Sequence, residues 1–447
     1  MLRETERTPP STRSLGRSSL RSCVRQVHTC TFVCGLVFSV CACADDDGTT
    51  DAAIDSAIDT QPDTDAGPPP PPPSEPGRHT VEVLETRQVV PGDGLPSEAI
   101  SMTSNNNLDV IRHDGRVYLA FRTGPDHFAG PEVLMHVVSS DDELTWEHEA
   151  TFDFDTDLRE PRFLVLDGRL LFYFSILGTN RFRFEPMGVR MSERLADGTW
   201  TEPADIGMTG YVVWRTRTER GTPYMTAYLG GEHIYLFDGM PLDVELRTTT
   251  DGLIWTPLRT EPGYVYRGGG SEMDFTLDDD GNLFSIIRNE AGDDTGWGSL
   301  VCRADAADIA DWTCVHDPKK YDSPLMFWHD GEAYLIGRRN VTETGRYDLG
   351  TPGATPTITT VRYQVDYSNS PKRCAVWRWV RDEDRIAYIT DLPSRGDTCF
   401  PARIDTTDPN RIVLYNYSSD INGPDIAWNV GQEGPTFIYR HVLEFTP

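Results

Sequence analysis

Six acidic residues stand at the beginning of apolar runs in this 447-residue sequence: Asp109, Glu160, Glu272, Asp274, Asp322 and Asp397. If those runs are the innermost strands around one channel, the acids would meet at its mouth. Cleavage of a glycosidic bond generally uses two carboxyl groups, one of which has a raised pKa. We take Glu272 as the foremost candidate, with Glu160 and Asp397 as substrate-binding members. The alternative, in a chain with 70 acidic residues, is that each acid faces solvent or caps a turn.

Three arginines, Arg122, Arg288 and Arg338, each end the second of two consecutive apolar runs. Arginine offers a planar fork of hydrogen-bond donors that suits anionic and hydroxyl-rich ligands. Their shared position predicts a ring of substrate-binding cations, and the alternative is three ion pairs between neighbouring strands. The sequence shows no cluster of His and Cys, no phosphate-binding glycine loop and no serine nucleophile elbow. We therefore expect neither a metal nor another cofactor.

The elements that would position these residues are short strands joined by acidic-glycine turns. Asp-Gly between alternating apolar strands is a strong hairpin signal, and the hairpins recur at intervals of about 50 residues, a period typical of β-propeller blades. We expect an all-β, six-bladed propeller with units at 101–157, 158–208, 209–262, 263–317, 318–393 and 394–447. The strand at 79–90 would complete the last blade at its outer edge. Five blades is the alternative, because the unit 318–393 is irregular.

Two segments resemble the Asp-box of the sialidase family. Ser139-Ser-Asp-Asp-Glu-Leu-Thr-Trp146 matches the pattern Ser-x-Asp-x-Gly-x-Thr-Trp except that Glu143 replaces the glycine, and Thr249-Thr-Asp-Gly-Leu-Ile-Trp255 is a shorter relative. In that family the box is a structural turn between outer strands. The resemblance thus implies a sialidase-like propeller in which Asp141 and Asp251 are architectural.

The resemblance also implies roles at the central pocket. The family's acid/base aspartate lies on the loop after the second strand of the first blade, where this sequence has Asp126. Its glutamate at the start of an inner strand and its substrate arginine at the end of the next strand match Glu272 and Arg288. The resemblance therefore implies acid/base chemistry by Glu272 and Asp126, with Arg288 orienting the substrate.

Two positions depart from the family pattern. Phe400 stands near the place of the tyrosine nucleophile, and Asn106, Asn107 and Asp109 stand near the place of the first arginine. Phenylalanine has no oxygen that could attack a sugar. Arg122 and Arg338 are the remaining candidates for a clamp of three arginines on the substrate carboxylate, but they do not stand at the positions that the family pattern gives these arginines. These departures weigh against sialic acid as the substrate.

We expect a glycoside-hydrolase-like propeller that acts on extracellular glycans. One alternative is a non-catalytic propeller that binds a glycan or a protein. Another is an arabinanase-like or invertase-like glycosidase. Two segments of this sequence faintly resemble the acid motifs of that family: Arg159-Glu160-Pro-Arg162 and Ser271-Glu272. In that alternative Asp109, Glu160 and Glu272 would be the working acids.

The first 43 residues have the form of a bacterial secretory signal. A segment with arginines up to Arg25 precedes an apolar run that is shorter than the roughly 20 residues of a membrane-spanning helix. Val40-Cys-Ala-Cys43 resembles a lipobox, which implies a lipid on Cys43, and the alternative is an ordinary cleaved signal. Residues 44–78, acidic and then proline-rich, predict a disordered linker, and residues 79–447 the propeller domain. We expect an exported lipoprotein of the outer membrane or cell surface, attached to the membrane through its lipid anchor only.

Charge and cysteine content narrow the partners and the compartment. The net charge of −29 weighs against nucleic acid, so the expected partner is an extracellular glycan or glycoconjugate. Four cysteines lie in the folded part, and an oxidising compartment would allow them to pair. Proximity on neighbouring strands favours Cys302–Cys314 and Cys374–Cys399, and the alternative is four buried thiols.

Overall fold

Antiparallel hairpins with glycine-containing turns build the fold. The computed structural model describes residues 67–447 of the chain. In the first hairpin, β2 (Ser104–His113) and β3 (Arg116–Gly124) are joined by Asp114 and Gly115, whose φ angles are 48° and 83°. Two successive residues in the left-handed region are what the tight hairpin turn demands, and Asp and Gly tolerate it best. The same Asp-Gly turn recurs at residues 167–168 and 330–331.

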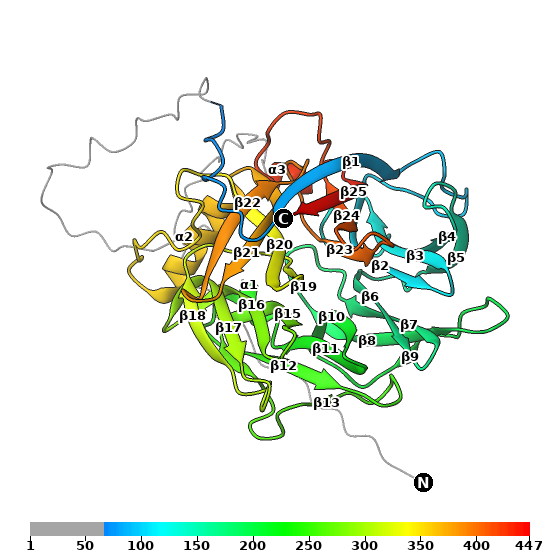
Figure 1. Ribbon diagram of the computed structural model, residues 1–447, viewed down its shortest axis with the longest axis horizontal. Helices are drawn as coiled ribbons and strands as arrows, with labels where there is room; N and C mark the ends of the chain where they lie inside the picture. Colours follow the sequence, from blue (N-terminus) through cyan, green and yellow to red (C-terminus); the bar gives the residue numbers. More distant parts are fainter. Residues whose placement is uncertain (1–66) are drawn as a thin grey trace, which may run out of the picture. The chain divides into compact units, whose positions relative to one another are not determined.

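Residues 67–447 form six sheets, each built as a blade of antiparallel strands (Figure 1). Blade 1 consists of β2, β3, β4 (Leu134–Ser140) and β5 (Glu147–Phe152). Blade 2 consists of β6 (Leu158–Leu166), β7 (Arg169–Leu177), β8 (Pro186–Arg194) and β9 (Ala204–Asp205). Blade 3 consists of β10 (Tyr211–Glu219), β11 (Thr222–Leu229), β12 (Leu242–Thr248) and β13 (Thr256–Pro257), with β14 (Tyr266–Gly268) also paired to β12.

The second half of the domain repeats the arrangement. Blade 4 consists of β15 (Gly270–Leu277), β16 (Leu283–Asp293), β17 (Gly296–Ala304) and β18 (Thr313–Asp317). Blade 5 consists of β19 (Leu325–His329), β20 (Glu332–Asn340), β21 (Lys372–Val380) and β22 (Arg385–Asp391). Blade 6 consists of β23 (Ala402–Asp405), β24 (Arg411–Ser418), β25 (Phe437–Thr446) and β1 (Thr80–Val90). Three helices lie in the loops: α1 (His233–Leu236), α2 (Pro356–Ser368) and α3 (Trp428–Gln432).

The innermost strands of neighbouring blades contact one another, so the sheets form a ring around a common axis. Contacts join β2 to β6, β6 to β10, β10 to β15, β15 to β19 and β23 to β2. The prediction of an all-β, six-bladed propeller is confirmed, and the five-bladed alternative is wrong because the irregular unit 318–393 forms a complete blade. Its irregularity comes from α2, inserted between β20 and β21.

The N-terminal strand closes the ring. β1 pairs with β25 from Thr80 opposite Thr446 to Val90 opposite Ile438, so the outer strand of blade 6 comes from the other end of the domain, as the sequence predicted. The residues just before β1 already contact blade 5, where the Glu75 N–H donates to the Tyr388 carbonyl at 2.8 Å. This arrangement leaves β25 paired on both sides, because β24 covers its other edge.

The two Asp-box-like segments fold into the same turn. Asp142 Oδ1 accepts hydrogen bonds from the N–H groups of Leu144 and Thr145 at 2.7 and 2.8 Å. Asp251 Oδ1 accepts from the same two positions of its own turn, both at 2.8 Å. A buried tryptophan ends each turn. The carboxylate therefore replaces a missing backbone acceptor and fixes the turn beside the core.

The assignment of Asp141 as the architectural aspartate of the first segment is wrong. Asp142 makes the turn, and the Asp141 side chain is 73% exposed. The structure aligns Ser140 with Thr249, one residue later than the sequence pattern does, since both hydroxyls accept from the N–H three residues on. Glu143 then takes the place of Gly252, and both have positive φ angles of 59° and 81°.

Two disulfides lie in different parts of the domain. Cys302 pairs with Cys314 between β17 and β18, and Cys374 on β21 pairs with Cys399, which precedes β23. The first disulfide therefore joins two strands of one blade, whereas the second joins blade 5 to blade 6. The expected signal segment 1–43, with Cys43, and linker residues 44–66 lie outside the described residues. Within residues 67–447, no helix combines the length and apolar character that crossing a membrane requires.

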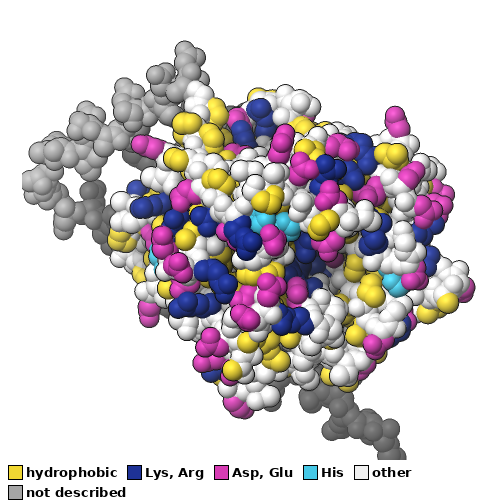
Figure 2. Space-filling model, viewed as in Figure 1, with side chains coloured by type: hydrophobic (Ala, Val, Ile, Leu, Met, Phe, Trp, Pro, Cys, Tyr) yellow, Lys and Arg dark blue, Asp and Glu magenta, His cyan; other side chains and the backbone are white. Residues whose placement is uncertain are grey.

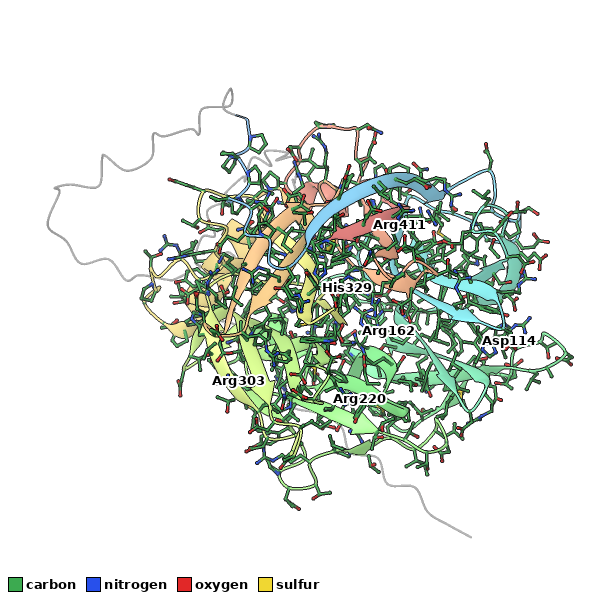
Figure 3. All side chains as sticks on the ribbon, in the orientation of Figure 1. Asp114, Arg162, Arg220, Arg303, His329 and Arg411 are labelled. Carbon is green, nitrogen blue, oxygen red and sulfur yellow. A yellow bond between two sulfur atoms is a disulfide. The ribbon has the colours of Figure 1, made fainter. Side chains whose placement is uncertain are left out.

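Charges of both signs are distributed over the surface. Figure 2 shows one face of the domain, on which acidic and basic side chains are interspersed with scattered apolar ones. Asp114, Arg220, His329 and Arg411 lie at or beside the turns that join the first and second strands of four blades (Figure 3). The loops at the other ends of these strands carry the residues described next.

Candidate functional site

Irregularities in the innermost strands determine which residues reach the mouth of the ring. In blades 1 to 4 the pairing of the first two strands shifts register near the start of the first strand, and the skipped residues are Asn107, Glu160 with Pro161, Trp214, and Ser271 with Glu272. A bulge of this kind re-aims a side chain out of the ladder. Two of the predicted site acids, the catalytic candidate Glu272 and the substrate-binding candidate Glu160, are thus placed by equivalent bulges in blades 4 and 2.

The backbone at two of these bulges is strained. Asn107 and Glu160 have φ angles of 38° and 52°, in a region that L-residues rarely adopt. Their side chains meet, because Asn107 Nδ2 donates to Glu160 Oε1 at 3.2 Å. Strain of this kind concentrates at functional sites. The pair therefore marks the blade 1 and blade 2 side of the mouth as a candidate site.

Below the bulges, buried charged and aromatic side chains fill the axis. Arg162, which Figure 3 shows near the centre of the ring, is completely buried and lies 4.6 Å from the Phe400 ring and 5.2 Å from the Trp214 ring. Arg215 is also buried and lies 3.6 Å from Asp274. Burial lowers the pKa of Arg162 to about 10, with the charge of Arg215 acting in the same direction. Phe400 therefore packs in the buried layer that also contains Arg162, Trp214 and Arg215, and we call this layer the floor of the site.

Glu272 and Arg288 form the centre of the site on blade 4. Arg288 Nη1 lies 2.8 Å from Glu272 Oε1 and 3.2 Å from Glu290 Oε2. Glu272 Oε2 accepts a hydrogen bond from the Ser323 N–H at 2.7 Å. The Glu272 side chain keeps 12% of its surface exposed, enough for one edge to meet a ligand.

Asp322 of blade 5 continues the network. Lys320 Nζ lies 2.7 Å from Glu290 Oε1 and 3.5 Å from Asp322 Oδ2. The Tyr367 hydroxyl, from the end of α2, donates to Asp322 Oδ2 at 2.7 Å. The insertion of α2 therefore supplies a tyrosine to the site.

The two neighbouring carboxyl groups have opposite pKa shifts. Burial raises the pKa of Glu272 to about 7; the Arg288 charge opposes this effect and the Asp322 charge adds to it. Burial also acts to raise the pKa of Asp322, but the charges of Lys320 and Arg338 outweigh it and lower that pKa to about 2. At neutral pH one carboxyl can hold or release a proton while its neighbour stays ionised.

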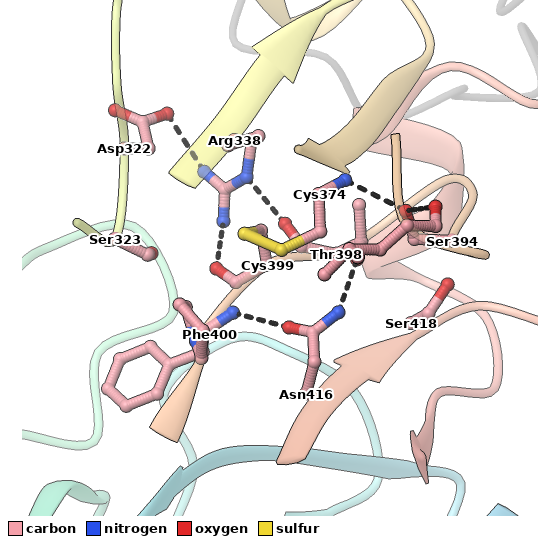
Figure 4. The surroundings of a disulfide bond; sticks show 12 residues. Asp322, Ser323, Arg338, Cys374, Ser394, Thr398, Cys399, Phe400, Asn416 and Ser418 are labelled. Atoms are coloured by element: carbon pink, nitrogen blue, oxygen red, sulfur yellow. Dashed lines mark hydrogen bonds and ion pairs between the residues drawn. A yellow bond between two sulfur atoms is a disulfide. The ribbon is translucent and has the colours of Figure 1, made fainter. Parts of the chain in front are cut away.

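Arg338 is held between blades 5 and 6 (Figure 4). Its Nη1 donates to Asp322 Oδ2 at 2.9 Å, and its Nε donates to the Thr398 carbonyl at 2.5 Å. Its Nη2 reaches the carbonyl of Cys399 at 3.4 Å, and Cys399 is bonded to Cys374 on β21. The disulfide therefore fixes the backbone that orients Arg338.

On the blade 6 side of the site, Asp397 is surrounded by hydrogen-bond donors. Its Oδ1 accepts hydrogen bonds from the Tyr417 hydroxyl and the Trp428 indole N–H, both at 2.9 Å. Its Oδ2 lies 2.7 Å from His127 Nδ1. Burial would raise the pKa of Asp397, but these neighbours, His127 first, lower it, with Arg338 acting in the same direction. Asp397 is therefore an ionised carboxylate in a nearly closed shell of donors.

Two predicted site residues have other contacts. Asp126 Oδ1 accepts from the Phe128 N–H at 2.8 Å, and Oδ2 is paired with Arg181. Arg122 is completely buried and donates to Asp157 at 2.9 Å and to the Phe128 carbonyl at 2.8 Å. Ion pairs through Glu290, Lys320 and Asp322 join Glu272, Arg288 and Arg338 in one network. The charges of Glu160 and Asp397 act on this network at Glu272 and Arg338, and Arg122 holds the loop that carries Asp126.

Four residues of the site were not singled out from the sequence as candidates: Glu290, Lys320, Tyr367 and His127. The chain has only three lysines, at 319, 320 and 372. Two of them, Lys320 and Lys372, are buried with Nζ 4.0 and 3.9 Å from the ring of Tyr367. The rarity of lysine in an arginine-rich chain was therefore the signal that could have located this part of the site.

An aromatic pocket adjoins the network. A cavity of about 340 Å³ lies between the loop 182–187 of blade 2 and α1 of blade 3, with Phe182, Phe184 and Tyr235 in its wall. The Tyr235 hydroxyl donates to Glu290 Oε2 at 3.4 Å, so one wall residue of the pocket contacts the charged network. Among residues 67–447, no group of three or more His, Cys, Asp or Glu side chains is arranged to hold a metal.

Comparison with known proteins identifies the fold. No protein-family model and no curated protein matches this chain. The solved structure of Trypanosoma rangeli sialidase matches 76% of this chain and 55% of its own, with 13% identity and a TM-score of 0.51. A protein of unknown function from Dyadobacter fermentans matches 81% of this chain and 99% of its own (14% identity, TM-score 0.49), and phage phi92 endosialidase matches 83% and 70% (12%, 0.49).

The chain spans about half the length of the sialidase structure that it matches. At these identities the likeness is one of fold. The chain is therefore a six-bladed β-propeller of the architecture found in sialidases.

Proposed function

We propose that this propeller is a glycoside-hydrolase-like protein that acts on an extracellular glycan or glycoconjugate. The observation that carries the proposal is the neighbouring pair Glu272 and Asp322, whose pKa values are about 7 and about 2. Carboxyl groups whose environments separate their pKa values are the usual pattern of acid/base assignment in glycosidases. Glu272 would exchange the proton, and the buried, ionised Asp322 would keep the pKa of Glu272 raised.

Other residues support the same function. Arg288 fixes the Glu272 carboxyl, and the rings of Phe182, Phe184 and Tyr235 offer faces on which sugars stack. Asp126, with 21% of its side chain exposed, is the candidate for the second catalytic carboxyl. In that role it would exchange Arg181 for the substrate.

Non-catalytic binding of a glycan or a protein is the second candidate. The contacts of Asp126 with Arg181 and Phe128 favour it, since they engage both carboxyl oxygens. The arabinanase-like or invertase-like alternative would also use Asp109. That residue is buried and accepts the Phe163 N–H at 2.7 Å, within the floor of the site, which disfavours a catalytic role.

The export expectation stands as part of the proposal. The lipobox-like segment ending at Cys43 supports an exported lipoprotein of the outer membrane or cell surface, with the lipid as its only membrane attachment. Two disulfides suit the oxidising compartment that export implies. Labelling of the expressed protein with a radioactive fatty acid, with and without Cys43→Ala, tests this part.

Hydrolysis of a panel of chromogenic glycosides by wild type and Glu272→Gln tests the enzymatic part. The expected result is turnover of at least one glycoside and a loss of about 10²-fold or more in kcat for the variant, the scale of acid/base contributions. Glu82→Gln, on an exposed part of β1, is the control. Turnover that survives Glu272→Gln would remove Glu272 from the mechanism. Glycan binding without turnover of any glycoside would establish the binding candidate instead.

A further inference from the structure

The basic side chains around the site are already paired with carboxylates. Arg288 contacts Glu272 and Glu290, and Lys320 contacts Glu290 and Asp322, all within 2.7–3.5 Å. Arg338 Nη1 is 2.9 Å from Asp322. Carboxylates of the protein therefore already balance the charges of these three cations, so none of them needs a ligand anion.

Each basic side chain around the mouth has a carboxylate of the protein as its partner. The paired distances are 3.6 Å for Arg162–Glu160, 2.8 Å for Arg288–Glu272, 2.7 Å for Lys320–Glu290 and 2.9 Å for Arg338–Asp322. Neighbouring charges lower the pKa of Asp322 and of Asp397, so both stay ionised at neutral pH. A ligand carboxylate placed here would meet like charges in a largely desolvated site, where such contacts are strongly unfavourable.

The unpaired hydrogen-bonding capacity suits hydroxyl groups. Within the described residues Arg288 donates through Nε to Ser271 Oγ at 2.9 Å and pairs through Nη1, which leaves Nη2 for a ligand oxygen. Carboxylate oxygens accept from sugar hydroxyls without any charge being buried on the ligand side. A neutral polyol therefore satisfies both kinds of group.

The wall of the aromatic pocket has more acidic than basic residues. It contains one basic residue, Arg183, and two acidic ones, Glu185 and Glu232, beside the aromatic rings. A sugar ring in this pocket would thus meet more carboxylate than cation.

We propose, building on the function proposed above, that the site selects neutral glycans and rejects acidic ones such as sialylated or uronic acid-containing sugars. This selectivity arises because Arg288, Lys320 and Arg338 are paired with carboxylates of the protein. The carboxylates are Glu272, Glu290 and Asp322. The arginines hold the carboxyl groups in place, and the part-exposed Glu272 carboxyl and Arg288 Nη2 contact the hydroxyls of the ligand.

Matched pairs of glycans that differ by one carboxylate test this proposal. The full chain is applied to an array that holds such pairs, including 3′-sialyllactose with its methyl ester and glucuronides with the corresponding glucosides. The expected result is that each pair that binds does so through its neutral member, with a preference of about tenfold or more. Equal or tighter binding of the acidic members would overturn the selectivity and leave the proposed glycan function intact. Absence of binding to every glycan would overturn both.

A charge variant provides an independent test. Glu290→Gln removes the carboxylate shared by Arg288 and Lys320, so the ratio of the affinity for the acidic member to that for the neutral member is expected to rise about tenfold in each pair, whatever the variant does to the affinity for the neutral member. Glu193→Gln, whose carboxylate pairs with Arg169 at 3.1 Å away from the site, is the control. An unchanged preference in a folded Glu290→Gln protein contradicts the proposal. If that variant does not fold, Glu185→Gln with Glu232→Gln at the pocket wall should shift the preference in the same direction, and no shift there would contradict it.

Discussion

The Arg288 guanidinium and the Glu272 carboxylate form an ion pair in which Nη1 and Oε1 are 2.8 Å apart. They come from adjacent strands of blade 4, β16 and β15, and the bulge before Met273 turns Glu272 toward the arginine. Arg288 is buried, and the carboxylates around it raise its own pKa. Arg288 therefore keeps its positive charge, and it faces the Glu272 carboxyl, whose pKa is about 7.

Replacement of Arg288 by Met should raise the pKa of Glu272 above about 7. The positive charge of Arg288 favours the ionised carboxylate, and its removal leaves burial and the Asp322 charge, which both favour the protonated form. Carbon-13 NMR titration of the Glu272 carboxyl measures the change directly. Arg303→Met, on the solvent-exposed part of β17, is the control. A pKa that fell in Arg288→Met would show that the pairing is not what holds Glu272.

The two disulfides should differ in what their loss does to the site. Loss of either should lower the free energy of unfolding by about 3 kcal/mol, the scale for closed loops of this size. Only Cys374→Ala with Cys399→Ala should speed hydrogen exchange at residues 397–400, because that segment supplies the carbonyls that hold Arg338. Cys302→Ala with Cys314→Ala is the matched comparison. Equal exchange in the two variants would contradict the positioning role.

Acid should destabilise the domain before most carboxylates titrate. Burial lowers the pKa of His136 and of His441 from 6.5 to about 4. The unfolded chain then binds protons that the folded chain does not, so stability is present above pH 6.5 and is lost as pH falls toward 4, by about 2–3 kcal/mol for each histidine.

Chemical denaturation of wild type and His136→Gln between pH 7 and pH 4 measures this loss. The variant should show a shallower fall, and His233→Gln, at a part-exposed position of α1, should follow wild type. A parallel fall in wild type and His136→Gln would exclude His136 as a source of acid sensitivity.

Phe400 should be a stability residue. Its ring is buried against Trp214 and the Arg162 guanidinium, so Phe400→Ala is expected to lower the free energy of unfolding by about 3–5 kcal/mol. Phe182→Ala, at a side chain 66% exposed, should change it by less than about 0.5 kcal/mol. Denaturant titration of the two variants compares them, and similar small effects would show that Phe400 does not support the floor.

The blades could be predicted from the sequence because their signals are local. A two-residue Asp-Gly turn and a strand period of two are complete within about a dozen residues. The blade borders follow from these signals, and so does the closing role of residues 79–90. The segment 318–393 was harder, although Thr355 followed by Pro356 is a helix-start signal and does cap α2.

The site could be predicted only in part because it depends on pairing between distant segments. The bulges that aim Glu160 and Glu272 are set by register against the neighbouring strand, which one sequence does not display. The partner of Asp126 is Arg181, on a loop of the next blade, and no local pattern joins them. Lys320, which precedes β19, and Tyr367, which lies on α2, both contact the Asp322 carboxylate.

The closing strand β1 has a mechanical consequence. A pulling force applied through the chain ahead of residue 67 reaches Glu75 and Arg78 first, and these are bonded to β22 and to Glu332 of blade 5. Only when those contacts fail does the load reach Thr80, where it would peel β1 from β25 one residue pair at a time, starting opposite Thr446. The hydrogen bonds of the segment before β1 would therefore have to break before a force applied to the preceding chain could open the ring.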